Sequence, residues 1–139
     1  MSNIPDKDLT IEQSEKALNL RIDEFLEKFN PQEMEDVAFR SARFDVGLAW
    51  IHFPEGQGGM GLRPNLQKVI ERRMREAGAM PTDPTTFFMS LAGPTISTHG
   101  TQEQRERFLK PMFTGEERWC QLFSEPGACL LYTSDAADD

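Results

Sequence analysis

The spacing of apolar residues near the start of the chain restricts its fold more than any other feature. Five of them follow one another at steps of 7, 4, 3 and 4 residues: Ile11, Leu18, Ile22, Phe25 and Phe29. These steps place all five on one face of a helix. Thr10 and Gln13 have the spacing of a capping box, and Asn30-Pro31 provides a stop, because a residue before proline avoids the α region. We therefore expect a core-facing amphipathic helix over residues 11–29.

Four more segments show helical patterns. Residues 32–49 carry a less regular apolar stripe, and residues 66–77 carry a clear one. Pro64 fits the first turn of the helix over 66–77, and Gly78 is its expected end. Residues 85–97 are apolar nearly all round, which predicts a buried helix, with a kink or a new turn at Gly93-Pro94.

The fifth helical segment begins with a second capping box. Thr101 and Gln104 supply it, and apolar residues recur from 108 to 113. Pro111 and Gly115 are expected to end this helix. The chain therefore reads as a predominantly helical protein up to about residue 117.

A glycine-rich stretch over residues 56–61 matches the G-x-G-x-x-G pattern of dinucleotide-binding loops. Such a loop holds a pyrophosphate when a strand precedes it and a helix begins inside it. Here Pro54 interrupts the strand, and the next helical stripe starts only after Pro64. A structural glycine turn is the favoured interpretation, and the dinucleotide site is the alternative.

Composition narrows the classes of function. The chain has 139 residues, enough for one ordinary domain, and a net charge of −8, which argues against nucleic acid as the main partner. His52 and His99 lack neighbours at ligand spacing, so we expect no metal site. No apolar run approaches membrane-spanning length, and residues 1–7 do not resemble a signal peptide. Cys120 and Cys129 form no CxxC motif, which favours a reduced, cytoplasmic setting.

The first strand-like segment begins at Arg118. Residues 118–123 contain good strand formers, and Glu125-Pro126-Gly127 is a turn signal. Such a strand end can present backbone groups and the Ser124 hydroxyl to the edge of a flat ligand. A serine that only caps the turn remains the alternative.

Three stretches of this sequence resemble the acyl-CoA dehydrogenase family. Residues 120–128, Cys-Gln-Leu-Phe-Ser-Glu-Pro-Gly-Ala, closely resemble the family's signature. Residues 93–104 resemble the helical domain just ahead of that signature, and residues 54–62 resemble its glycine-rich turn. The resemblance covers roughly residues 10–128 in consistent order.

The resemblance implies a mainly α fold: an N-terminal helical domain over residues 1–117, then the first strand and turn of a truncated middle β-domain at 118–128. Family members hold FAD non-covalently and desaturate an acyl-CoA thioester between Cα and Cβ. A glutamate removes the α proton, and the β hydrogen leaves as hydride to the flavin. The electrons pass to an electron-transfer flavoprotein, and the full-length proteins are usually homo-oligomers.

The resemblance also implies roles for particular residues. The flavin-lining strand would contain Gln121, Leu122, Phe123 and Ser124. Phe123 would offer backbone groups to the ring system, and Ser124 its hydroxyl. The acyl tunnel would be lined by Met89, Ser90 and Leu91. The base comes from a later part of the family fold, so no catalytic residue is assigned, and Glu125 is expected to serve a turn or a subunit contact.

The chain departs from the family pattern after Ala128. Cys129 stands where the family has a glycine, and Leu130 stands where it has a small hydroxyl residue. We expect residues 129–139 to be a non-native or disordered tail, and the chain as written to be inactive. The alternative is a non-catalytic helical interaction module, for which the resemblance would be a coincidence.

Overall fold

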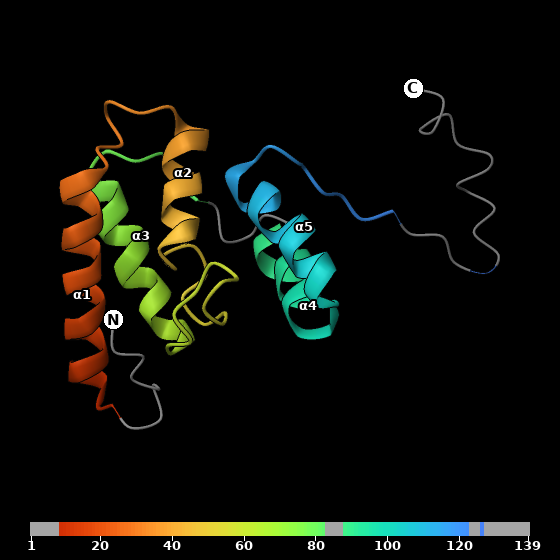
Figure 1. Cartoon of the computed structure of the whole chain (residues 1–139), viewed down its shortest axis with the longest axis horizontal. Helices are drawn as coiled ribbons and strands as arrows, with labels where there is room; N and C mark the ends of the chain where they lie inside the picture. Colours follow the sequence, from red (N-terminus) through yellow and green to blue (C-terminus); the bar gives the residue numbers. More distant parts are fainter. Residues whose placement is uncertain (1–8, 83–87, 123–125, 127–139) are drawn as a thin grey trace.

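The computed structural model describes residues 9–82, residues 88–122 and residue 126, without the side chains of residues 88 and 89. The helices follow in the order α1 (Ile11–Lys28), α2 (Asp36–Asp45), η2 (Pro64–Leu66), α3 (Gln67–Glu76), η3 (Phe88–Ala92), α4 (Gly93–His99) and α5 (Gln102–Thr114). Figure 1 shows this order along the chain. The predicted fold class, mainly α, is confirmed.

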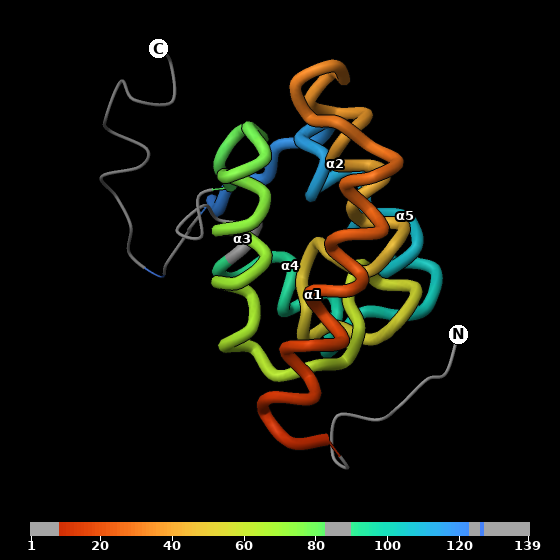
Figure 2. The backbone as a smooth tube through the Cα atoms, turned by 90° about the vertical axis from the view of Figure 1, so that its left-hand side faces the viewer, coloured from red at the N-terminus to blue at the C-terminus, as the bar shows by residue number. Residues whose placement is uncertain are grey.

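The helices form two layers with α2 between them. Figures 1 and 2 show α1 beside α3 on one side, and α4 with α5 on the other. The loop over residues 46–62 lies with α2 in the middle. Within the described ranges, no helix is long and apolar enough to cross a bilayer.

The first helix agrees with its sequence pattern except at its start. Thr10 Oγ1 accepts from the Gln13 amide and the Gln13 side chain accepts from the Thr10 amide, so the capping box is confirmed. Leu18, Ile22 and Phe25 are buried on one face. Ile11 was expected on that face but is 57% exposed, because it lies in the first turn, where α1 reaches beyond α3 (Figure 1).

The second helix is shorter than the expected 32–49. Residues before it form a turn in which the Glu33 amide donates to the Asn30 carbonyl. At the other end Gly47 has φ of 82°, which a right-handed helix cannot contain, and the Leu48 amide donates back to Arg43. The apolar residues from 48 to 51 are therefore buried in a loop instead of a helix.

The glycine-rich stretch is a structural turn, as favoured above. A Cβ on Gly58 would lie 2.6 Å from the Phe44 ring, and one on Gly59 would lie 2.1 Å from the Phe53 carbonyl oxygen. The amides of Gln57, Met60 and Gly61 already donate to backbone carbonyls of the same loop. These three donors are not available to a phosphate, and the next helix begins only at Pro64, which favours the structural turn over a dinucleotide site.

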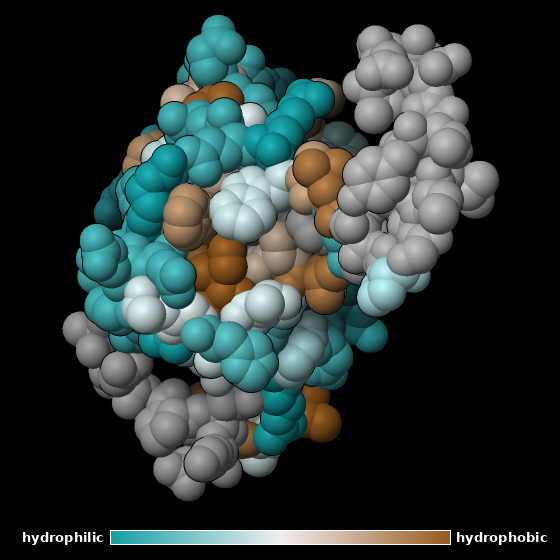
Figure 3. Space-filling model, turned by 90° about the vertical axis from the view of Figure 1, so that its right-hand side faces the viewer, coloured by the Kyte–Doolittle hydropathy of each residue, from teal (hydrophilic) through white to brown (hydrophobic). Residues whose placement is uncertain are grey.

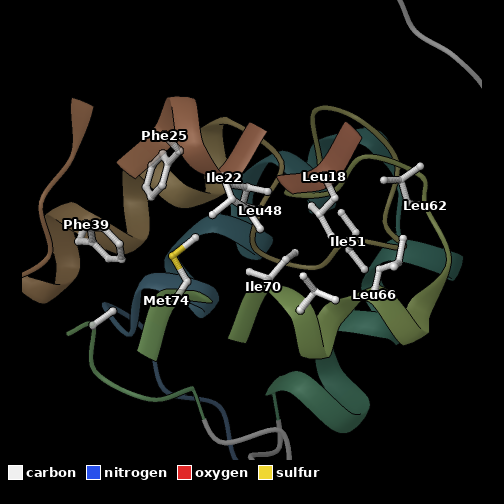
Figure 4. Packing of buried hydrophobic residues seen from close by; sticks show 12 residues of the cluster. Leu18, Ile22, Phe25, Phe39, Leu48, Ile51, Leu62, Leu66, Ile70 and Met74 are labelled. Carbon is white, nitrogen blue, oxygen red and sulfur yellow. The ribbon is translucent and has the colours of Figure 1, made fainter. Parts of the chain in front are cut away.

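The third helix matches its prediction closely. Pro64 opens the short helix η2, which leads directly into α3, and Gly78 follows the end of α3 with φ of 92°. The buried residues of α3 are Val69, Ile70 and Met74. They face α1 in a cluster that Figure 4 shows from close by.

The fifth helix ends at Gly115 as expected, but Pro111 does not stop it. Its capping box between Thr101 and Gln104 is confirmed, but α5 continues through Pro111 to Thr114, where Gly115 caps it with φ of 86°. Met112 and Phe113 are fully buried. Proline removes one backbone hydrogen bond from the helix, and the burial of these two side chains keeps the last turn helical despite that loss.

Two hydrophobic clusters make up the core. The first joins α1, α2, α3 and the loop; it contains Leu18, Ile22, Phe25, Phe39, Leu48, Ile51, Leu62, Leu66, Val69, Ile70, Met74 and Ala79. The second joins the loop to α5 and contains Phe44, Ala49, Trp50, Phe53, Leu109 and Phe113. The loop over residues 46–62 supplies both clusters, so it connects the two layers.

Residues 118–122 have no regular secondary structure. A strand needs a neighbouring strand with which to share hydrogen bonds, and the part of the chain that the structure describes contains no strand. The expected flavin-lining strand therefore stays a prediction. Residues 123–125 and 127–139, including the expected tail, lie outside the described residues.

Candidate functional site

The proposed acyl-lining residues lie on η3. This is a single π-helical turn that continues directly into α4, and π-helical turns are frequent at functional sites. Ser90 is exposed and Leu91 is 44% exposed, while Ala92 and Gly93 are buried. The burial expected for this segment is therefore wrong for Ser90 and Leu91. Met89 belongs to the same turn by its backbone.

The proposed flavin-lining residues follow α5. Gln121 is exposed, and Leu122 is 89% exposed. No hydrogen bond engages the amides of these two residues within ranges 9–82 and 88–122. Phe123 and Ser124 lie outside the described residues, as does Glu125.

Helix α5 is the element that relates the two groups. It packs against α4 and η3, and the segment that follows it carries Gln121 and Leu122. Its own position is fixed because Leu109 and Phe113 lie in the second core cluster. Figure 3 looks onto this side of the molecule and shows apolar surface gathered near its middle. Exposed apolar surface of this kind is where a ligand or another domain can bind.

A hydrogen bond that the sequence did not predict connects α4 to the glycine turn. Ser97 Oγ and Gln57 Oε1 are 2.9 Å apart, with the hydroxyl donating. The two residues are 40 positions apart in sequence, so no local pattern reveals the pair. The bond ties the helix that continues η3 to the loop between the two layers.

The charged group that the sequence missed most completely is Arg43. Its Nε donates to the Leu48 carbonyl at 2.7 Å, and its Nη2 pairs with Glu71. Burial lowers the pKa of Arg43 from its ordinary value, and the Glu71 carboxylate opposes this by stabilising the charge. This contact joins α2 to α3 and to the loop that follows α2.

The described residues contain no cluster of side chains that could hold a metal ion. No group of three or more His, Cys, Asp or Glu is gathered there. His52 packs edge-on against Phe53 at 4.7 Å, and partial burial lowers its pKa.

A groove of about 410 Å³ lies between α1 and the end of α2. Its lining residues are Arg21, Glu24, Phe25, Lys28, Phe29, Asp45 and Val46. None of these residues belongs to the predicted flavin-lining or acyl-lining groups. The groove opens on the first core layer, so it is not part of the candidate site.

Comparison with known proteins shows which family this helical unit resembles. Residues 12–116 match the family model described as "Acyl-CoA dehydrogenase, N-terminal domain". The chain is 42% identical over 98 residues to "Acyl-CoA dehydrogenase FadE34" of Mycobacterium tuberculosis, which covers 70% of this chain and 13% of that protein. It is 38% identical over 83 residues to "Acyl-CoA dehydrogenase IpdE1" of the same organism, covering 60% of this chain and 21% of that protein.

A third relative has a reductase name. The chain is 30% identical over 117 residues to "Caffeyl-CoA reductase-Etf complex subunit CarC" of Acetobacterium woodii, covering 83% of this chain and 30% of that protein. No solved structure matches the chain. The chain spans less than a third of the length of each of these relatives. The family match covers most of the helical unit, and this chain belongs to the acyl-CoA dehydrogenase family.

Proposed function

We propose that this chain supplies the helical domain of a flavin-dependent acyl-CoA dehydrogenase. In this proposal residues 1–117 form the N-terminal domain, and residues 118–128 begin the middle β-domain. The observation that carries the proposal is the family match over residues 12–116, and residues 120–122, a few positions beyond it, are exposed. Exposed chain after a domain fits a protein whose cofactor site continues in another domain.

The chemistry of residues 121–124 fits the edge of a flavin. Among the described residues no hydrogen bond engages the amides of Gln121 and Leu122, and Ser124 adds a hydroxyl in the next part of the chain. Fixed donors near a flavin ring tune its electronics, and a bound flavin would supply the hydride-accepting chemistry. In this proposal Gln121, Leu122, Phe123 and Ser124 hold and orient that ring.

The acyl chain would lie against η3. Leu91 offers exposed apolar surface, and Met89 and Ser90 share the same helical turn. Burial of this surface by an acyl chain would be favourable at about 25 cal/mol per Å². The base that removes the α proton would come from outside this chain, so the chain alone has no dehydrogenase activity.

The partners follow from the same family membership. The substrate class is an acyl-CoA thioester, and the electron acceptor is an electron-transfer flavoprotein. One relative is named as a subunit of an Etf complex, which supports this choice of acceptor. We further propose a cytoplasmic, homo-oligomeric enzyme, in keeping with two cysteines that have no CxxC spacing.

Reading the DNA on both sides of the coding segment tests this function. The proposal expects a β-rich segment followed by long helices in one reading frame that continues past Ala128. It also expects residues 129–139 to be replaced in that frame. An intact gene that ends at Asp139 would contradict the proposal.

A binding measurement on the chain complements the DNA test. The purified 139-residue chain should retain no flavin after FAD is added and excess is removed, because most of the cofactor site lies in other domains. The readout is visible flavin absorbance per protein. Near-stoichiometric flavin would show that the chain forms a complete site by itself, contrary to the proposal.

A further inference from the structure

The segment after α5 stays in contact with that helix over its first few residues. It turns back along α5 before it runs away from the helical body (Figure 1). Gly115 makes the turn with φ of 86°, and the Glu117 amide then donates to the Pro111 carbonyl at 3.1 Å. Thr114 Oγ1 lies 2.9 Å from a Glu116 carboxylate oxygen and also supports the turn.

Four side chains form a series of contacts across this turn. Arg107 pairs with Glu117 at 2.7 Å, and its guanidinium lies 4.9 Å from the centroid of the Phe108 ring. Phe108 meets Trp119 edge-on, with ring centroids 5.2 Å apart at 80°. Arg107 and Phe108 on α5 therefore each contact one residue beyond the turn.

A series of linked contacts differs from an isolated surface ion pair. An exposed pair alone is weak, because two long side chains must be ordered for little gain. Here the guanidinium also lies over the Phe108 ring, and that ring contacts Trp119. Ordering one side chain helps to order its neighbours, so the contacts reinforce one another.

We propose that Arg107, Phe108, Glu117 and Trp119 form a clasp that sets the direction in which the chain leaves the helical domain. They are positioning residues for the flavin-lining segment, an inference that rests on the proposed function. Only Cys120 separates Trp119 from Gln121. At about 3.3–3.6 Å per residue, covalent geometry keeps the Gln121 Cα within about 7 Å of the Trp119 Cα, so a clasp that fixes Trp119 also limits where Gln121 can lie.

The position of the clasp relative to the domain supports this role. Arg107 and Phe108 lie on α5 inside the family-matched range 12–116, while Glu117 and Trp119 lie just beyond it. Helix α5 is anchored in the core and packs on η3, which carries the proposed acyl-lining residues. The clasp therefore links the proposed flavin-lining segment to the same helix that supports the proposed acyl-lining turn.

Hydrogen exchange of the 139-residue chain tests the clasp itself. Trp119→Ala should speed exchange of the Glu117 amide, which donates to the Pro111 carbonyl, by about tenfold, because an aromatic contact that holds the turn is lost. Trp119→Phe should recover most of this protection, since it keeps the ring contact. Glu117→Gln should speed exchange by about threefold. The amides of α5 from 106 to 110 should not change in any variant.

Glu76→Gln is the matched control, because Glu76 forms an exposed ion pair with Arg72 on another helix. It should leave exchange of the Glu117 amide as in the wild-type chain. If Trp119→Ala and Glu117→Gln also exchange at the wild-type rate, the clasp does not exist in solution and the inference is overturned.

Flavin retention by the full-length protein from the same gene tests the positioning role. Trp119→Ala should retain about tenfold less flavin than wild type with unchanged helical content, and Trp119→Phe should restore it. Faster exchange with unchanged flavin retention would overturn the positioning role. A wild-type protein without flavin would contradict the proposed function, and the exchange result on the 139-residue chain would still decide the clasp.

Discussion

Arg43 on α2 and Glu71 on α3 form an ion pair in which the arginine side chain is 2% exposed and the glutamate 22%. The guanidinium also lies 5.2 Å from the centroid of the Phe113 ring on α5. Glu71 accepts a second hydrogen bond from Gln67, whose side chain also binds the loop at Ala49 and Ile51. One buried cation thus contacts both core layers.

Removing only the carboxylate should destabilise the fold strongly. Glu71→Ala leaves the Arg43 guanidinium buried without its counter-charge, and we expect a loss of about 3 kcal/mol in the free energy of unfolding. Arg43→Met combined with Glu71→Met should cost less than Glu71→Ala alone, because no unpaired charge remains. Urea denaturation followed by far-UV circular dichroism measures both.

The exposed pair of Arg72 and Glu76 serves as the reference for that measurement. Its side chains are 60% and 63% exposed, so Glu76→Ala should change the free energy of unfolding by less than about 1 kcal/mol. Equal losses for Glu71→Ala and Glu76→Ala would contradict the role given to the buried pair.

Alanine substitutions in the glycine turn should separate crowding from backbone strain. Gly59→Ala places a Cβ 2.1 Å from the Phe53 carbonyl oxygen and should cost at least about 3 kcal/mol. Gly56→Ala has open space at φ of 84° and should cost only about 1–2 kcal/mol. Thermal unfolding compares the two. A Gly56→Ala variant as unstable as Gly59→Ala would contradict the packing described for this turn.

The features that the sequence predicted well depend on neighbours a few residues away. Both capping boxes join residues three positions apart, and the ends of α3 follow from Pro64 and Gly78. The apolar steps of α1 are set by helical geometry alone. These elements were predictable because their determinants are local.

Loss of the second capping box should destabilise α5 and with it the proposed site. Thr101→Ala removes the oxygen that accepts from the Gln104 amide and should cost about 1 kcal/mol. Thr101→Ser keeps this oxygen and is the control. Denaturation midpoints should fall for alanine and stay near wild type for serine. The same midpoint for both variants would show that the box contributes nothing.

The features that the sequence missed depend on distant partners. Arg43 and Glu71 are 28 positions apart, and no local pattern marks Arg43 as the buried charge that Glu71 and Phe113 surround. The end of α2 was misplaced because the apolar run from 48 to 51 suits a buried loop as well as a helix. Ser90 and Leu91 looked buried by composition, yet the described residues leave both exposed.

The clasp should loosen in acid. Hydrogen bonding to Arg107 lowers the pKa of Glu117 below its ordinary value of 4.5. A lowered carboxyl pKa means that the contact is fully present above the ordinary value and is lost as pH falls through the lowered pKa. Arg107 stays charged throughout this pH range, and the Glu116 carboxylate on the same turn accepts a hydrogen bond from the Thr114 hydroxyl.

Fluorescence of Trp119 measures this acid transition. The wild-type spectrum minus that of Trp119→Phe should stay constant from neutral pH down to the ordinary glutamate pKa, then change below it. Glu117→Gln should abolish the change, and far-UV circular dichroism should confirm that the helices remain folded. A transition above the ordinary glutamate pKa would contradict the assigned direction of the shift.

The most direct test of a flavin-dependent acyl-CoA dehydrogenase is an anaerobic titration of the full-length protein from this gene with acyl-CoA thioesters. The flavin would accept hydride from the substrate, so its visible absorbance reports the reaction. The account predicts a protein that carries flavin whose absorbance is bleached by at least one saturated acyl-CoA. A full-length protein that carries no flavin, or whose flavin no acyl-CoA reduces, would contradict it.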